Sequence, residues 1–195
     1  MTEHHLQGFA HLQGFAESQG FARTDGFAVW LTGLPASGKS TIAKSLKSQL
    51  IERGEEGEVL ESDELRKVFT PRPRYDQEER DLFYRQIAYV GALLTRHGIA
   101  VIFDATANRR IYRDWARREI RKFLEVYIEC PLEVCMSRDP KGIYRKGLAE
   151  GKSVPGLHVE YEAPEAPGVV IRGDRESAEE AAGKVVAKLA ELKYL

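Results

Sequence analysis

The chain has 195 residues and a net charge of −1, and 43% of its residues are hydrophobic and 30% are charged. These proportions fit one ordinary globular domain, and the balanced charge gives no sign of a nucleic-acid-binding or membrane-binding surface. The two cysteines, Cys130 and Cys135, have a spacing that fits neither a redox pair nor a zinc knuckle. Because no apolar stretch has membrane-spanning length and no secretory signal is present, we expect a cytoplasmic protein with no nucleic-acid or membrane partner.

The N-terminus repeats Gly-Phe-Ala every six residues, at 8–10, 14–16, 20–22 and 26–28. Only the last copy leads into a predicted strand, and a six-residue unit is too short for the common solenoid folds. We therefore predict that residues 1–25 are a mobile leader and that residues 26–195 form the folded domain. The alternative is that Phe9, Phe15 and Phe21 dock on a partner subunit.

A phosphate-binding motif follows the first predicted strand. Residues 27–31 are apolar, and residues 41–50 have the pattern of an amphipathic helix. Between them the sequence fits GxxxxGK[ST], whose glycines let backbone N–H groups converge on an anion at the start of a helix. The lysine of this motif would reach the outer phosphates of ATP, and the serine hydroxyl would bind Mg²⁺. The residues predicted to hold the nucleotide are Gly33, Leu34, Pro35, Ala36, Ser37, Gly38, Lys39, Ser40 and Thr41.

The rest of the chain alternates between strand and helix patterns. This alternation predicts an α/β fold of the P-loop NTPase type, a three-layer sandwich with a central, mostly parallel sheet. Ligands bind such sheets at the C-terminal ends of the strands. The predicted strands are 58–61, 99–104, 124–130 and 169–171, and the predicted helices are 64–69, 77–97, 112–123, 132–138 and 177–192.

Two acidic residues end predicted strands at that edge of the sheet. Asp63 follows the second strand, where a carboxylate could orient an acceptor hydroxyl, take up its proton or hold Mg²⁺. The alternative is that Ser62 and Asp63 only cap the next helix. Asp104 ends the third strand and could be a second acid near the metal, or again a capping residue.

Cationic residues gather in two segments. Guanidinium groups match the faces of phosphate and sulfate, and a cationic flap over a triphosphate would exclude water and neutralise charge. We therefore predict a mobile basic lid at about 138–167, although any one of these residues could simply be a solvated surface charge. Tyr75, between arginines, could stack on a purine. The first group is Arg66, Arg72, Arg74, Arg80 and Arg85, and the second is Arg138, Lys141, Arg145, Lys146 and Lys152.

Several runs stand in an order that is typical of one kinase family. They are GFAVWLTGL at 26–34, FLEVYI at 123–128, PLEVC at 131–135, RDPKGIY at 138–144 and YEAP at 161–164. With these runs, residues 26–171 resemble the adenylylsulfate kinases, which use ATP to phosphorylate the 3′-hydroxyl of adenosine 5′-phosphosulfate. Within the acceptor site the sequence departs from the family pattern at Glu61, Ser62, Glu64, Tyr75 and Phe83.

The resemblance implies roles for single residues. Lys39 would stabilise the transferring group, and Asp63 would position or deprotonate the acceptor and share Mg²⁺ with Ser40. Thr106, the third predicted catalytic residue, takes the position of a serine that is phosphorylated in part of the family. The residues predicted to bind adenosine 5′-phosphosulfate are Asp63, Arg66, Tyr75, Arg80, Arg85, Arg109 and Lys141.

We therefore expect an ATP-dependent, Mg²⁺-assisted kinase acting on adenosine 5′-phosphosulfate. The sequence itself does not reveal the oligomeric state, and the resemblance implies a homodimer only because the family is commonly dimeric. Two alternatives stay open. One is a P-loop kinase for another small hydroxyl acceptor, such as a nucleotide, a sugar acid or a polynucleotide end. The other is a nucleotide-binding partner protein with degraded catalysis, which only the replaced acceptor-site residues support.

Overall fold

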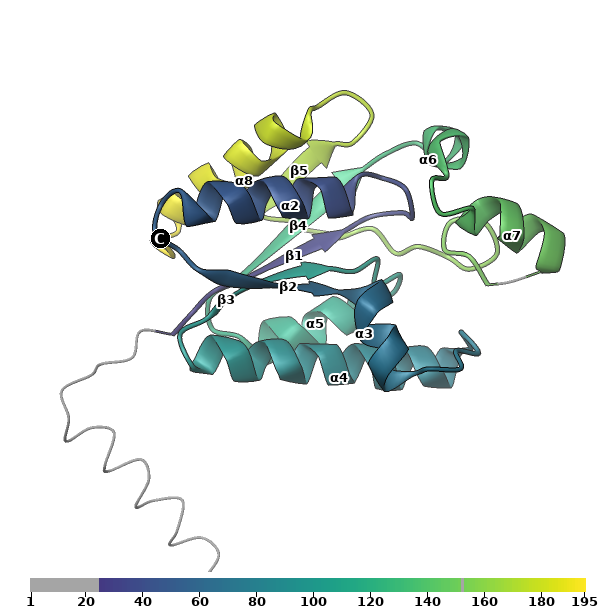
Figure 1. The fold of residues 1–195 in the computed structure, drawn as a ribbon, viewed down its shortest axis with the longest axis horizontal. Helices are drawn as coiled ribbons and strands as arrows, with labels where there is room; N and C mark the ends of the chain where they lie inside the picture. The colour runs from purple at the N-terminus through teal and green to yellow at the C-terminus, as the bar shows by residue number, and fades with distance from the viewer. Residues whose placement is uncertain (1–24, 152) are drawn as a thin grey trace, which may run out of the picture.

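The computed structural model describes residues 25–151 and 153–195, so the predicted leader and Lys152 lie outside the described residues. Five strands form one sheet in the order β2-β3-β1-β4-β5 (Figure 1). Every neighbouring pair is parallel, which confirms the predicted sheet and makes it parallel throughout. The strands are β1 Ala28–Thr32, β2 Gly57–Glu61, β3 Ala100–Asp104, β4 Phe123–Glu129 and β5 Val169–Arg172.

Helices cover both faces of the sheet and confirm the three-layer sandwich. In Figure 1, α2 and α8 lie over one face, while α4 and α5 lie over the other. No helix within residues 25–151 and 153–195 combines the length and apolar character that crossing a bilayer requires. The helices are α2 Lys39–Ile51, α3 Ser62–Phe69, α4 Gln77–Arg96, α5 Arg110–Glu119, α6 Leu132–Arg138, α7 Ile143–Glu150 and α8 Ala178–Glu191.

The central strands β1 and β3 are buried along their whole length because helices cover them on both sides. Trp30 of β1 stacks on Phe103 of β3, with ring centroids 4.3 Å apart. A Cβ at Gly91 of α4 would stand 2.1 Å from the Phe103 ring, so this glycine lets α4 approach the sheet closely. The core under α4 and α5 therefore depends on an aromatic layer and one small residue.

The strand register brings the ends of three strands together. Leu31 is paired with Asp104, and Asp104 is paired with Glu61. The phosphate loop after β1, the chain after β3 and the start of α3 therefore leave the sheet side by side. The candidate functional site is built at this edge of the sheet.

The predicted lid contains a helix that the sequence patterns missed. Together α6 and α7 extend beyond the C-terminal edge of the sheet (Figure 1). Gly142 and Gly151 flank α7 with φ values of 65° and 64°, a left-handed conformation that favours glycine. Two glycines within the predicted lid are thus the caps of a short helix. Its buried Tyr144 packs with Cys130, Cys135 and Val154 in a small apolar cluster of its own.

Two sequence predictions are wrong in detail. The predicted helix 112–123 begins earlier and ends at Glu119, because Ile120 turns to an extended conformation and buries its side chain in the core. The alternative that Ser62 and Asp63 cap α3 is also wrong. Glu61 is the N-cap without a side-chain bond, and Asp63 lies inside the first turn, where its carboxylate is not used to cap the helix.

Candidate functional site

A cavity of about 710 Å³ opens at the C-terminal edge of the sheet. Its walls come from the phosphate loop, the start of α3, the loop before α4, the chain after β3, and the lid. The structure therefore brings most of the predicted site residues together. Those that line the cavity are Pro35, Ala36, Gly38, Lys39, Ser40, Thr41, Asp63, Arg66, Tyr75, Arg80, Thr106 and Lys141.

The phosphate loop has the backbone geometry of an anion nest. Ala36 and Gly38 have φ values of 60° and 107°, and Gly38 is the N-cap of α2. A Cβ at Gly33 would meet the carbonyl oxygen of Ile128 at 2.5 Å, so only glycine fits there. This loop directs the N-terminus of α2 at the cavity, where a phosphate would find unpaired N–H groups.

Lys39 folds back onto its own loop. The Nζ atom donates to the carbonyl oxygens of Gly33 at 3.1 Å and Leu34 at 2.8 Å, and the residue is 8% exposed. Burial lowers the pKa of this ammonium group, while the carboxylates of Asp104 and Asp63 act in the opposite direction. A buried cation held by carbonyl groups can exchange them for phosphate oxygens with little further desolvation.

Asp63 faces the lid across the cavity. Its Oδ2 accepts a hydrogen bond from Nζ of Lys141 at 2.6 Å, and Glu61 Oε1 lies 3.5 Å from the same nitrogen. The bond to Asp63 raises the pKa of Lys141 above its ordinary value. The predicted catalytic carboxylate and a predicted substrate-binding lysine thus neutralise one another.

Oxygen donors suited to a hard cation lie in the same place. Ser40 and Asp104 line the main cavity, together with Asp63, and also a smaller one of about 460 Å³ beside α2. Within the described part of the chain, no group of three His, Cys, Asp or Glu residues could hold a metal ion alone. Mg²⁺ prefers such sparse oxygen sites, because it keeps several waters and binds phosphate oxygens. The residues present therefore fit Mg²⁺.

Arg66 is a buried cation in an aromatic surround. Its Nη1 lies 3.1 Å from Glu79 Oε1, and its guanidinium stands 3.9 Å from the ring centroid of Phe83 and 5.0 Å from that of Tyr75. Glu79 also accepts from the backbone N–H of Tyr75 at 3.4 Å. The guanidinium is thus fixed by packing, as bidentate recognition of two oxygens of a phosphate or sulfate group requires.

Arg80 ties the acceptor side of the cavity to the lid. Its Nε donates to the carbonyl oxygen of Tyr75 at 2.9 Å, and its Nη2 donates to that of Ser153 at 2.8 Å. Burial lowers the pKa of Arg80. Tyr75 has a φ of 59°, a strained conformation for a non-glycine residue, and Arg80 helps to hold it there.

Comparison with known proteins shows which family this chain belongs to. The sequence model of the adenylylsulphate kinases matches residues 25–172. The chain belongs to the adenylyl-sulfate kinase family. Over 168 residues it is 44% identical to the adenylyl-sulfate kinase of Microcystis aeruginosa, a match that covers 86% of this chain and 93% of that protein. It is 39% identical to a probable adenylyl-sulfate kinase of Pyrococcus abyssi, with 86% and 97% covered.

A solved adenylyl-sulfate kinase structure has the same fold. The enzyme of Mycobacterium tuberculosis, in complex with AMPPNP and APS, superposes with a TM-score of 0.80 at 31% identity. The match covers 85% of this chain and 98% of that one. The predicted membership of a P-loop kinase family is therefore confirmed, by sequence and by structure.

Two residues predicted from the family pattern to bind the acceptor lie outside the cavity lining. The guanidinium of Arg85 stands 4.6 Å from the ring centroid of Trp115, between α4 and α5. Arg109 pairs with Asp81 at 3.6 Å and with Glu162 at 3.9 Å. In this structure both arginines make contacts within the protein, and their role in substrate binding stays a prediction.

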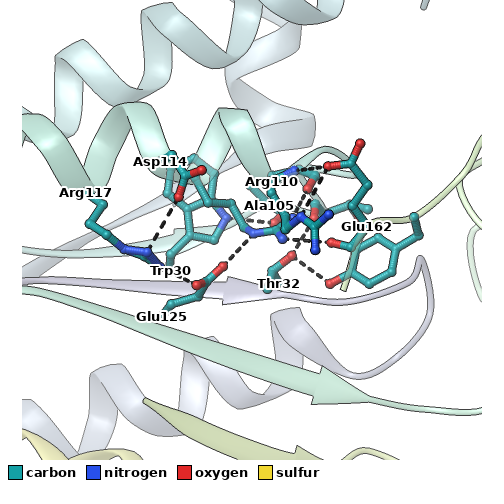
Figure 2. Close-up of polar contacts among 12 residues, drawn as sticks. Trp30, Thr32, Ala105, Arg110, Asp114, Arg117, Glu125 and Glu162 are labelled. Carbon is teal, nitrogen blue, oxygen red and sulfur yellow. Dashed lines mark hydrogen bonds and ion pairs between the residues drawn. The ribbon is translucent and has the colours of Figure 1, made fainter. Parts of the chain in front are cut away.

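The structure also shows residues around the site that the sequence analysis missed. Tyr84 lines the cavity and accepts a hydrogen bond from the backbone N–H of Ala107 at 3.0 Å. Arg113 is buried, and its Nε lies 2.5 Å from Glu125 Oε1, while Arg117 bonds to the other carboxylate oxygen (Figure 2). Glu61 is named in the sequence analysis only as a departure from the family pattern, and its contact with Lys141 was not expected. The others depend on contacts between distant segments, which no local pattern reveals.

Proposed function

We propose that the chain transfers the γ-phosphoryl group of ATP to the 3′-hydroxyl of adenosine 5′-phosphosulfate, giving ADP and 3′-phosphoadenosine 5′-phosphosulfate. The observation that carries the proposal is that one cavity joins the phosphate loop to Asp63, Arg66 and Arg80. Family membership supports the assignment, and the related enzyme of M. tuberculosis was solved with AMPPNP and APS together.

On the donor side, the nest at residues 33–41 would hold the ATP phosphates. Lys39 would exchange the two loop carbonyls that it now contacts for phosphate oxygens, and its charge would stabilise the group in transit. Mg²⁺ would be held by the hydroxyl of Ser40 and the carboxylate of Asp63, with Asp104 close by. When bound, the ion neutralises charge on the phosphates.

On the acceptor side, Asp63 would orient the 3′-hydroxyl and take its proton as the new P–O bond forms and the bond to ADP breaks. Lys141 must then leave Asp63, which frees its ammonium group for the phosphosulfate. Arg66 and Arg80 would bind the anionic part of the acceptor, and Tyr75 would stack on its purine. Thr106 lines the same cavity, where it would lie near the reacting groups.

A homodimer is the assembly that we propose. Leu82, Tyr89 and Leu93 are spaced to share one side of α4, and they are 56%, 63% and 41% exposed. Apolar side chains that gather on one exposed helix face commonly mark an interface. Light scattering on the purified chain, compared with Tyr89→Glu, would test the assembly. A cytoplasmic location stays a prediction from the sequence.

The decisive experiment measures ADP release by the purified full chain with ATP, Mg²⁺ and adenosine 5′-phosphosulfate. Turnover should depend on all three, and the product should carry the phosphate on its 3′-oxygen. An acceptor panel of nucleotides, sugar acids and polynucleotide ends serves as the comparison. Faster turnover of another acceptor would overturn the assignment, and tight ATP binding without turnover on any of them would indicate a degraded enzyme.

A further inference from the structure

The loop that carries Thr106 is held by three side chains from two other elements, β1 and α5. Each of its three consecutive carbonyl oxygens accepts a hydrogen bond from a buried side chain: Ala105 from Trp30 Nε1 at 3.1 Å, Thr106 from Thr32 Oγ1 at 2.7 Å, and Ala107 from Arg113 Nη1 at 2.5 Å (Figure 2). Buried carbonyls normally find partners in secondary structure. Here side chains replace that structure and fix the loop against β1 and α5.

Thr32 has a special place in this set, because it directly precedes Gly33, the first residue of the phosphate loop. It is fully buried at the end of β1. Its hydroxyl bonds to the Thr106 carbonyl and also lies 2.9 Å from the hydroxyl of Tyr161 (Figure 2). One side-chain oxygen therefore joins the residue before the phosphate loop, the Thr106 loop and the C-terminal part of the predicted lid segment, which contains Tyr161.

The directions of these bonds follow from counting hydrogens. A hydroxyl has one hydrogen to donate, and a carbonyl oxygen can only accept. Thr32 must therefore donate to Thr106, so Tyr161 must donate to Thr32. Burial raises the pKa of the Tyr161 hydroxyl, which keeps its hydrogen in place. The result is a one-way chain of hydrogen bonds from Tyr161 through Thr32 to the Thr106 carbonyl.

The segment around Tyr161 is itself anchored. The backbone N–H of Glu162 donates to the Asn108 carbonyl at 2.7 Å, and Arg113 Nη2 donates to the Glu162 carbonyl at 2.7 Å. The side-chain amide of Asn108 donates to the Glu160 carbonyl at 3.1 Å. Residues 160–162, although they fall within the predicted lid segment, are thus bound to the Thr106 loop and to α5, so we expect any lid movement to involve the residues before them.

We propose that Thr32 is a positioning residue for phosphoryl transfer, whose hydroxyl sets the Thr106 loop against the phosphate loop. The inference rests on the proposed kinase reaction. Thr32 does not line the cavity, so it acts only through the groups that it holds. Its bonds keep the donor and acceptor sides of the cavity in one relative placement, on which in-line transfer depends.

The test compares Thr32→Val with Thr32→Ser in the full chain. Valine keeps the shape of threonine and removes both hydrogen bonds, whereas serine keeps the hydroxyl. We expect Thr32→Val to lower kcat by roughly tenfold, because a small misplacement of reacting groups is costly. The KM values for ATP and for the acceptor should stay within about twofold, since neither subsite loses a contact. Thr32→Ser should restore most of the lost kcat.

A purely structural role predicts a different pattern. In that case Thr32→Val would lower the melting temperature and leave kcat per folded molecule unchanged, or Thr32→Ser would be as impaired as Thr32→Val. Either result overturns the inference. If the wild-type chain shows no turnover with adenosine 5′-phosphosulfate, it is the proposed function that fails instead.

Tyr161→Phe tests the same chain of hydrogen bonds from its other end. If Thr32→Val does not fold, the kcat of Tyr161→Phe is the measurement that tests the positioning role. It removes one hydroxyl and keeps the ring, which stacks on Tyr127. We expect kcat to fall by roughly threefold, because the bond from Thr32 to Thr106 remains. The double variant with Thr32→Val should be no slower than Thr32→Val alone. Independent, multiplying effects, or an unchanged kcat in Tyr161→Phe, would contradict the proposed relay.

Discussion

The phosphate loop and the lid both bring a lysine to the same cavity, but they hold it in opposite ways. Lys39 is buried and bound to carbonyl groups of its own loop, and burial lowers its pKa. Lys141 is half exposed and bound to a carboxylate from across the cavity, which raises its pKa. The first cation is fixed in advance of any ligand, and the second depends on where the lid lies.

This difference corresponds to two tasks of the site, donor binding at the phosphate loop and acceptor binding beside the lid. Donor binding uses backbone geometry that the sheet edge and Gly33 enforce, so it should tolerate little change. Acceptor binding uses side-chain pairs, including Arg80 to Ser153 and Lys141 to Asp63, that a substrate can rearrange. Variants on the two sides should therefore fail differently.

The largest effect is expected for Lys39→Ala. Turnover should fall by at least about a thousandfold, because a charge aimed at the transferring group is lost. The fold should survive, since the loop conformation depends on its glycines and its backbone. Steady-state ADP release and circular dichroism measure the two properties. A variant that turns over at the wild-type rate would remove Lys39 from the mechanism.

Arg80→Ala should break the acceptor side alone. We expect the KM for adenosine 5′-phosphosulfate to rise by roughly ten- to a hundredfold, as is usual for a buried charged contact, while the KM for ATP changes little. Arg85→Ala is the matched control, because Arg85 packs on Trp115 outside the cavity lining. Equal effects on both substrates would place Arg80 elsewhere. An Arg85→Ala variant as impaired as Arg80→Ala would support the family-based prediction for Arg85.

Gly91→Ala tests how tightly α4, which carries Arg80 and Tyr84 of the acceptor side, packs on the sheet. The added methyl group would meet the Phe103 ring, and overpacking of this kind costs about 1–3 kcal/mol of unfolding free energy. Gly183→Ala of α8 is the control, because its nearest neighbour is a flexible Gln49 atom 3.9 Å away. That change should be neutral or stabilising by up to about 1 kcal/mol. Urea unfolding compares them, and equal stability of the two variants would show that the core yields easily.

Lys141→Gln should weaken acceptor binding, which uses side-chain pairs that a substrate can rearrange. We expect kcat/KM for the acceptor to fall by roughly tenfold, while ATP affinity, measured by calorimetry, stays the same. Lys141→Arg keeps the charge and should recover part of the loss. If ATP affinity fell as strongly as acceptor use, the lid lysine would belong to the donor side.

The smallest effect concerns pH. Burial lowers the pKa of Lys39, so its charge should be lost at a lower pH than that of an ordinary lysine, whose pKa is 10.5. As the pH rises, kcat/KM for ATP should therefore begin to fall before pH 10.5 is reached. Lys141 has a raised pKa and stays charged through that range. The alkaline limb should therefore be the same in Lys141→Arg as in the wild type. If the alkaline fall in kcat/KM moved to another pH in Lys141→Arg, the titrating group would be Lys141 of the lid and not Lys39.

The sequence predicts most of the sheet and the phosphate loop, because both are local patterns: apolar strands, and glycines at fixed spacing. The lid helix α7 escaped prediction since its glycine caps have the composition of a loop. The placement of Arg85 and the bonds of Thr32 could not be predicted at all. Thr32 meets residues 74 and 129 positions away, and such contacts arise only when the whole sheet is assembled.

The two left-handed glycines at the ends of α7 have a consequence for how substrates enter. The eight residues of the helix carry their own internal hydrogen bonds, so we expect the predicted lid to open by torsion at Gly142 and Gly151 and by release of the bond from Tyr144 to the Pro35 carbonyl, with no unwinding of the helix. Rotation at two glycines costs less free energy than unfolding the helix between them. Admission and release of nucleotides should accordingly proceed with the helical content of the protein unchanged.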